Sequence, residues 1–303
     1  MEAKSNISNP KYTVCVCNYN MGDTIEEALT SVVEQLNDDY EVIVVDDGSS
    51  DDSIKKLKKL SLRYSILRYV ALERDSSRLL GETRNISIKE AKGQYVLLHI
   101  DADDVWGPYI QDFVSVFHKI ETCLGRDILL SGQQINMGKK VFLLSHGPYR
   151  NIYRGEDYDL FHRLATIRAY IPIDHKVFRE RLQRSNKLMF FKIIDNIWSH
   201  LYLDLVRGRS RVGNILRTML GIFSIYNDWS VAHRIGRFIL IIPAVVYSIL
   251  KPKILPPKNM PDHTSFVSYR ESTRGTYAEI MKRHDSNPSL DFLRCDAQAI
   301  FRN

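Results

Sequence analysis

Apolar runs alternate with amphipathic stretches along roughly the first 170 residues of the chain. Short runs of strand-forming residues predict buried strands, and apolar residues spaced three and four apart predict helices. Strands are predicted at Tyr12–Cys17, Tyr40–Val45, Ser65–Ala71, Tyr95–Ile100, Asp127–Ser131 and Lys140–Leu144. Helices are predicted at Ile25–Leu36, Ser53–Tyr64, Arg78–Lys92, Tyr158–Ile167 and from Pro108 to about Leu124. This alternation predicts an α/β fold with a mostly parallel sheet and right-handed crossovers.

Local signals refine two of these helix ends. Asp23 is placed to cap the first helix, and Glu26, three residues on, completes a capping box. Gly93 follows the helix Arg78–Lys92 and is a fitting stop for it.

One strand ends abruptly in carboxylates. The run from Tyr95 leads directly into Asp101, Asp103 and Asp104. Ligands of open α/β sheets bind beyond the carboxyl ends of the strands. Acids packed together repel one another, and Mg²⁺ or Mn²⁺ removes that repulsion with the oxygen ligands it prefers. The pattern is equally typical of an acidic turn or a helix N-cap, so both interpretations stay open at this point.

Two further stretches carry candidate chemistry. Asp46 to Asp51 follows the second predicted strand; a carboxylate there can bind a base edge or a ribose hydroxyl, and Gly48 permits close backbone approach. The competing interpretation is a turn in which Ser49 or Asp51 caps the next helix. Arg84, with Asn85, suits a phosphate or a buried carboxylate, or is simply a surface helix residue.

Glu156 and Asp157 stand at the start of a predicted helix. A carboxylate near a bound diphosphate can act as general base toward an incoming hydroxyl. The alternative is an acid stabilised by the helix dipole.

The C-terminal third has a different character. Between Arg207 and Lys258 the sequence holds nine basic residues and a single acid, Asp228. Two apolar patches lie within it, Met219–Tyr226 and Phe238–Leu250. The second spans 13 residues and contains Pro243, whereas crossing a bilayer takes about 20 residues. We therefore expect either helices lying in the membrane interface or a buried helix of a C-terminal subdomain. A further amphipathic helix is expected near Thr276–His284.

Composition bounds the remaining possibilities. A chain of 303 residues with 44% apolar residues predicts one or two folded domains. The four cysteines are too few and scattered for a disulfide framework, and Met1 opens no apolar leader, so we expect a cytoplasmic protein. There is no dinucleotide fingerprint, P-loop, zinc-spaced cluster or hydrolase elbow. The aliphatic runs beside the basic residues suit lipid better than nucleic acid.

Five motifs in this order resemble the family 2 glycosyltransferases of GT-A fold, over about residues 11–170. They are Val16–Asn20, Val44–Asp51, Gly81–Asn85, Ala91–Asp104 and Gly155–Leu164. The resemblance implies a hexosyltransferase-type enzyme that moves a sugar, with inversion, from a UDP-, GDP- or dTDP-sugar to a hydroxyl or phosphate acceptor, usually with Mg²⁺ or Mn²⁺. It favours a catalytic GT-A domain over residues 1–180. The C-terminal third shows no such resemblance, and its change of character predicts a helical region over 181–303.

The resemblance also assigns roles. Tyr19 and Asp47 are expected to hold the base. The ribose and the metal fall to Asp101 and Asp103, with Asp104 as a further metal ligand. Arg84 is a donor-binding candidate. Asp157, rather than Glu156, is the expected general base.

Two departures from the family pattern matter. Cys17-Asn18 stands where the family often has Pro-Thr or Pro-Ser, and no Gln-x-x-Arg-Trp follows Asp157, which disfavours the processive synthases. The expected acceptor is a lipid-linked saccharide, a polyprenyl phosphate or a surface polysaccharide precursor, met at the inner face of a membrane. The alternatives are a sugar-phosphate nucleotidyltransferase and a non-catalytic nucleotide-sugar-binding module.

Overall fold

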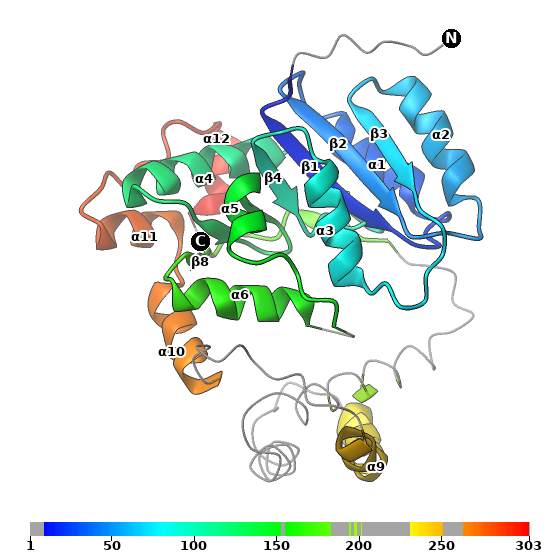
Figure 1. Cartoon of the computed structure of the whole chain (residues 1–303). Helices are drawn as coiled ribbons and strands as arrows, with labels where there is room; N and C mark the ends of the chain where they lie inside the picture. Colours follow the sequence, from blue (N-terminus) through cyan, green and yellow to red (C-terminus); the bar gives the residue numbers. More distant parts are fainter. Residues whose placement is uncertain are drawn as a thin grey trace. The chain divides into compact units, whose positions relative to one another are not determined.

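The computed structural model of the chain (Figure 1) describes residues 9–152, 155–182, 194, 197–198, 201, 231–250 and 263–302. The chain forms two compact units. The first takes Met1–Asn151, Glu156–Arg184 and Phe266–Asn303, and the second takes Ile152–Gly155 and Ser185–Ser265. The end of the chain thus belongs to the first unit, and a domain boundary at residue 180 stays a prediction.

The first unit is built on a seven-stranded mixed sheet with the order β3-β2-β1-β4-β7-β6-β8. Its strands are β1 (Tyr12–Asn18), β2 (Tyr40–Asp46), β3 (Leu67–Ala71), β4 (Tyr95–Leu98), β6 (Leu129–Ser131), β7 (Asn136–Lys139) and β8 (Tyr170–Pro172). The first four run parallel, β6 and β8 pair in parallel, and β7 is antiparallel to both of its neighbours. The predicted α/β class with a mostly parallel sheet is confirmed.

Helices cover both faces of this sheet because alternate strand residues point to opposite sides. Val14 and Val16 of β1 lie in one apolar cluster and Cys15 in the other. The first cluster is covered by α1 (Ile25–Val33), α2 (Ser53–Arg63), α4 (Ile110–Leu124), α11 (Tyr277–Arg283) and α12 (Cys295–Phe301). The second is covered by α3 (Leu80–Glu90), α5 (Lys140–Ser145), α6 (Glu156–Thr166) and α10 (His263–Thr273).

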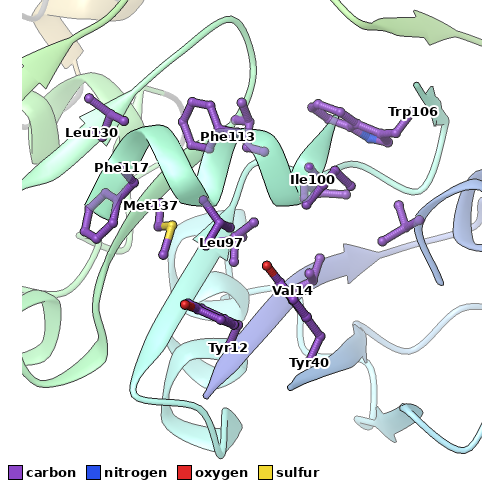
Figure 2. Packing of buried hydrophobic residues seen from close by; sticks show 14 of the residues in the cluster. Tyr12, Val14, Tyr40, Leu97, Ile100, Trp106, Phe113, Phe117, Leu130 and Met137 are labelled. Carbon is purple, nitrogen blue, oxygen red and sulfur yellow. The ribbon is translucent and has the colours of Figure 1, made fainter. Parts of the chain in front are cut away.

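The centre of the first cluster joins α4 to the middle strands (Figure 2). Phe113 and Phe117, one helical turn apart on α4, pack toward Leu97 of β4. Tyr12 and Tyr40 stack across β1 and β2 with ring centroids 4.7 Å apart. This packing fixes the central strands, whose carboxyl ends carry the candidate site.

Two local predictions are wrong. The run Lys140–Leu144 forms helix α5 rather than a strand, and the strand is the preceding Asn136–Lys139. A short apolar run does not distinguish the two states. Asp23 does not cap α1: the N-cap is Thr24, whose hydroxyl accepts no hydrogen bond from the helix N–H groups and donates one to the backbone oxygen of Ala102.

The capping box that is present stands at α11, where Thr276 and Glu279 bond reciprocally. The helix expected near Thr276–His284 is therefore confirmed. The structure also adds a small antiparallel ribbon of β5 (Asp104–Trp106) and β9 (Arg179–Arg181) that the periodicity did not indicate.

The apolar run Phe238–Leu250 lies within α9 (Val231–Leu250) in the second unit. The patch Met219–Tyr226 lies outside the described residues. Among the helices that the structure describes, none has the length and hydropathy needed to span a membrane.

A matched pair of leucine substitutions tests the core. Leu97 is 0% exposed and Leu62 of α2 is 82% exposed. We expect Leu97→Ala to lower the free energy of unfolding by about 2–5 kcal/mol, because it leaves a cavity beneath α4. Leu62→Ala should change it by less than about 0.5 kcal/mol. Urea denaturation of both variants measures the difference, and equal losses would contradict this packing.

Candidate active site

The loops after β1 and β2 are tied together by Asp46. Its carboxylate accepts hydrogen bonds from the backbone N–H groups of Gly48 (3.1 Å) and Ser49 (2.9 Å), and from the side chain of Asn18 (2.5 Å). A buried carboxylate with this many donors is fully occupied as a loop organiser. The neighbouring Asp47 is also buried, but its carboxylate pairs outside this loop.

Asp47 is held by two arginines. Arg74 Nη1 and Arg78 Nε each lie 2.5 Å from one of its carboxylate oxygens. The Arg74 guanidinium also stacks over the ring of Tyr19, 4.3 Å from its centroid. Gly48 makes this approach possible: its φ is +76°, and a Cβ there would lie 2.6 Å from the backbone nitrogen of Arg74. Tyr19 and Asp47 are therefore joined, through Arg74, into one patch.

The three acids after β4 gather as expected. Asp101, Asp103 and Asp104 each present an oxygen within 4.8 Å of the others. Asp103 and Asp104 are buried, and Asp101 is partly exposed. Hard divalent cations take carboxylate oxygens in such a cluster, so the donor set fits Mg²⁺ or Mn²⁺. Burial raises the pKa of Asp101, while Arg84 and Arg181 oppose that shift.

The ribbon β5–β9 supplies counter-charges to this cluster. Arg179 Nη1 lies 2.7 Å from Asp104 Oδ1, and Arg181 Nε lies 2.9 Å from the same oxygen. Asp104 and Arg181 are direct partners across the ribbon, and Arg179 stands two positions before Arg181 on the same face. Asp104 is thereby committed to these arginines.

Arg84 lies between the acids that follow β4 and Glu156, the first residue of α6. Its guanidinium lies 3.6 Å from Glu156 and packs over the Tyr149 ring at 5.5 Å. Arg84 and Asp101 also interact electrostatically. Among the described residues, the buried Arg84 Nη1 has no hydrogen-bond partner. One donor of this buried arginine is therefore left unsatisfied by the residues that the structure describes.

Close packing brings α3 to the start of α6. A Cβ on Gly81 would lie 2.4 Å from the backbone oxygen of Arg150, so only glycine fits there. The side chain of Asn85 bonds both the N–H and the carbonyl of Tyr149. Asn85 is thus a structural clamp, and it fixes the tyrosine on which Arg84 packs.

Glu156 and Asp157 differ in environment although they are adjacent. Glu156 is buried against Arg84, and desolvation raises its pKa while Arg84 lowers it. Asp157 is less buried, and its Oδ1 accepts a hydrogen bond from the backbone N–H of Tyr158. Among the described residues, its other carboxylate oxygen has no recorded hydrogen bond or ion pair.

Sequence reasoning missed several residues of this site: Arg74, Arg78, Tyr149, Arg179 and Arg181. They carry no motif and come from segments far from the acids they contact. The one usable signal was Arg179-Glu-Arg181, whose alternating charges suit one face of a strand. His99, which has a left-handed φ of +65° and bonds Tyr149 (3.0 Å) and Asn136 (2.6 Å), was also unforeseen.

Comparison with curated proteins gives partial matches. Poly(ribitol-phosphate) beta-glucosyltransferase of Bacillus spizizenii is 40% identical over 100 residues, which are 32% of this chain and 15% of the relative. The chain spans between 15% and 38% of the length of the first three curated relatives.

Two solved structures share the fold. The mannosyltransferase PcManGT from Pyrobaculum calidifontis, solved with GDP-Man and Mn²⁺, aligns with a TM-score of 0.53 and 17% identity over 78% of this chain and 88% of that one. S. aureus TarS, solved with UDP-GlcNAc, aligns with a TM-score of 0.51 and 17% identity over 78% and 81%. The fold is that of the GT-A glycosyltransferases.

The family model described as glycosyl transferase family 2 matches residues 13–177, more than half of the chain. The matched region runs from β1 to just beyond β8 and takes in all the acids described above. The chain belongs to glycosyl transferase family 2.

Proposed function

We propose that this protein transfers a sugar, with inversion, from a nucleotide-diphosphate sugar to an acceptor hydroxyl. One observation carries the proposal: acids from separate strand ends and a helix start gather along one edge of the sheet. Arg84 links Asp101 to Glu156, and Thr24, after β1, bonds the backbone of Ala102 in the acidic loop. Membership of the family supports this assignment.

The nucleotide base is assigned to the patch of Tyr19 and Asp47. An exposed ring supplies a stacking surface, and a carboxylate accepts hydrogen bonds from N–H groups of the base edge. Arg74 and Arg78 hold the Asp47 carboxylate in place before the donor arrives. Asp46 holds the loop and makes no such contact.

The diphosphate is assigned to the neighbourhood of Asp101, Asp103 and Arg84. Asp101 and Asp103 would hold a divalent ion. Asp104 would lie behind them, with its carboxylate still bound by Arg179 and Arg181. A bound ion would supply positive charge beside the leaving diphosphate. Arg84 would direct its unpartnered Nη1 toward a phosphate or sugar oxygen.

The chemical step is assigned to Asp157. Its carboxylate accepts the proton of the acceptor hydroxyl while that oxygen forms a bond to the anomeric carbon. The bond from the anomeric carbon to the diphosphate oxygen breaks on the opposite face, and the configuration inverts. Glu156 cannot share this role equally, since it is buried against Arg84.

Helix α9 supports a peripheral contact with a membrane, where a lipid-linked or surface polysaccharide precursor would be met. One side of the helix packs on Ile197 and Leu201 through Ala244 and its neighbours. The opposite side exposes a continuous stripe of large apolar residues: Ile235, Phe238, Ile239, Ile242, Val246, Ile249 and Leu250. Such a stripe in a basic sequence suits an anionic bilayer surface.

Donor binding can be tested by thermal shift with UDP-, GDP- and dTDP-sugars, with and without Mn²⁺. A ligand at 100 times its Kd stabilises the folded state by about 2.7 kcal/mol. We expect a metal-dependent shift with one donor, its loss in Asp47→Ala and its retention in Asp38→Ala, because Asp38 is an exposed acid outside the site. A shift for Asp47→Ala as large as that of the wild type would contradict the base site.

The roles of Glu156 and Asp157 can be separated by their stability and turnover. Glu156→Ala should lower the free energy of unfolding by about 3 kcal/mol, since it leaves Arg84 buried and unpaired. Asp157→Ala should cost less than about 0.5 kcal/mol but reduce release of nucleoside diphosphate from the donor by at least about 100-fold. Urea denaturation and a coupled diphosphate assay give the two values. Full turnover in Asp157→Ala would exclude it as the base.

The membrane contact can be tested by sedimentation with vesicles of phosphatidylglycerol and of phosphatidylcholine. The wild type should sediment with the anionic vesicles, and the pair Ile239→Glu with Ile242→Glu should remain in the supernatant. The control is Leu62→Glu with Val141→Glu, which charges two exposed apolar positions elsewhere. Absence of wild-type binding, or equal loss in the control, would refute the contact.

A further inference from the structure

The side chain of Arg181 reaches all three acids that follow β4. Its Nη2 lies 2.9 Å from Asp101 Oδ2, 3.1 Å from Asp104 Oδ2 and 3.8 Å from an oxygen of Asp103. The three acids offer oxygens within 4.8 Å of one another. One positively charged nitrogen therefore lies beside the same three carboxylates that would hold a divalent ion.

The two arginines of β9 are not equivalent. Among the described residues, the ion pair of Arg179 is with Asp104, and its side chain is mostly buried. Arg181 is 47% exposed and extends beyond Asp104 to Asp101 and Asp103. Arg179 is thus suited to a permanent ion pair. The side chain of Arg181 is already half-exposed, so it can break its contacts with Asp101 and Asp103 without leaving a buried position.

We propose that Arg181 is the resident counter-cation of the Asp101–Asp104 cluster, and that a divalent ion displaces its guanidinium from Asp101 and Asp103. The inference rests on the metal site proposed above. Two cations within a few ångströms of each other repel, so ion and guanidinium cannot share these oxygens. Arg181 therefore lowers the affinity of the protein for the free ion.

The donor resolves this competition. Its diphosphate brings negative charge to the site, and a guanidinium with a planar set of donors binds phosphate oxygens in pairs. The Arg181 head group, still tethered beside Asp104 by β9, would move from the carboxylates to the diphosphate. Binding of the ion and of the nucleotide is then coupled, and the protein retains little metal until the donor is present.

The test is the affinity for Mn²⁺ alone, by isothermal titration calorimetry without nucleotide. Arg181→Gln removes the competing charge and should lower the Kd for Mn²⁺ by about tenfold, because charge-assisted hydrogen bonds no longer oppose the ion. Mn²⁺ should also raise the Tm of Arg181→Gln more than that of the wild type. Arg181→Met serves the same purpose if Arg181→Gln does not fold.

Two controls separate local competition from net charge. Lys58→Gln removes one positive charge from the exposed side of α2 and should bind Mn²⁺ like the wild type. Arg181→Lys keeps the positive charge, so its affinity for Mn²⁺ should remain as low as that of the wild type. If Lys58→Gln bound Mn²⁺ as tightly as Arg181→Gln does, the inference would be overturned.

The remaining outcomes distinguish the inference from the function on which it rests. If the wild type binds Mn²⁺ and Arg181→Gln binds it no more tightly, the inference fails and the metal site stands. If neither protein binds Mn²⁺, with or without UDP or GDP, the metal site itself fails and the inference with it.

Discussion

The site depends on the neutralisation of carboxylates that the fold concentrates at one edge of a sheet. Parallel strands deliver their loops to the same edge, and here those loops carry Asp46, Asp47 and the cluster from Asp101 to Asp104. Unpaired, these charges would repel one another and lose hydration. Arginines from other segments balance them: Arg74 and Arg78 at Asp47, and Arg179 and Arg181 at Asp104. These ion pairs hold the acid-bearing loops together before any ligand binds.

The need to neutralise these carboxylates also explains the ribbon of β5 and β9. The chain forms it when it returns to the acidic loop after α6. Asp104 begins β5, and β9 pairs with it so that Arg181 faces it directly. Without that pairing, a buried acid with 0% exposure would lack its partners. The segment after β8 is therefore part of the acidic site, even though it follows the last strand of the sheet.

Sequence patterns predicted the elements whose periodicity is unambiguous, such as β1, β2, β4 and α4, and they identified the acids that the fold brings together. They failed where tertiary contacts decide. The strand predicted at Lys140–Leu144 is a helix. Its short apolar run is compatible with either state, so the sequence pattern could not distinguish them. Thr24 rather than Asp23 precedes α1, and its hydroxyl bonds the acidic loop instead of capping the helix. Arg179 and Arg181 were missed because pairing with an acid 75 or 77 residues away leaves no local signal, and Arg74 and Arg78 pair with Asp47 across 27 and 31 residues.

The two acids of each adjacent or nearly adjacent pair at this site have different partners. Asp46 is bonded within its own loop, whereas Asp47 pairs with Arg74 and Arg78. Asp104 is bound by Arg179 and Arg181, whereas Asp101 contacts the half-exposed Arg181 and interacts electrostatically with Arg84. Glu156 is buried on Arg84, whereas Asp157 is less buried and accepts a hydrogen bond from the backbone N–H of Tyr158. Under the proposed function this doubling of the acids serves a physical need: one carboxylate fixes the geometry with internal bonds, and the other, held in position beside it, meets the ligand.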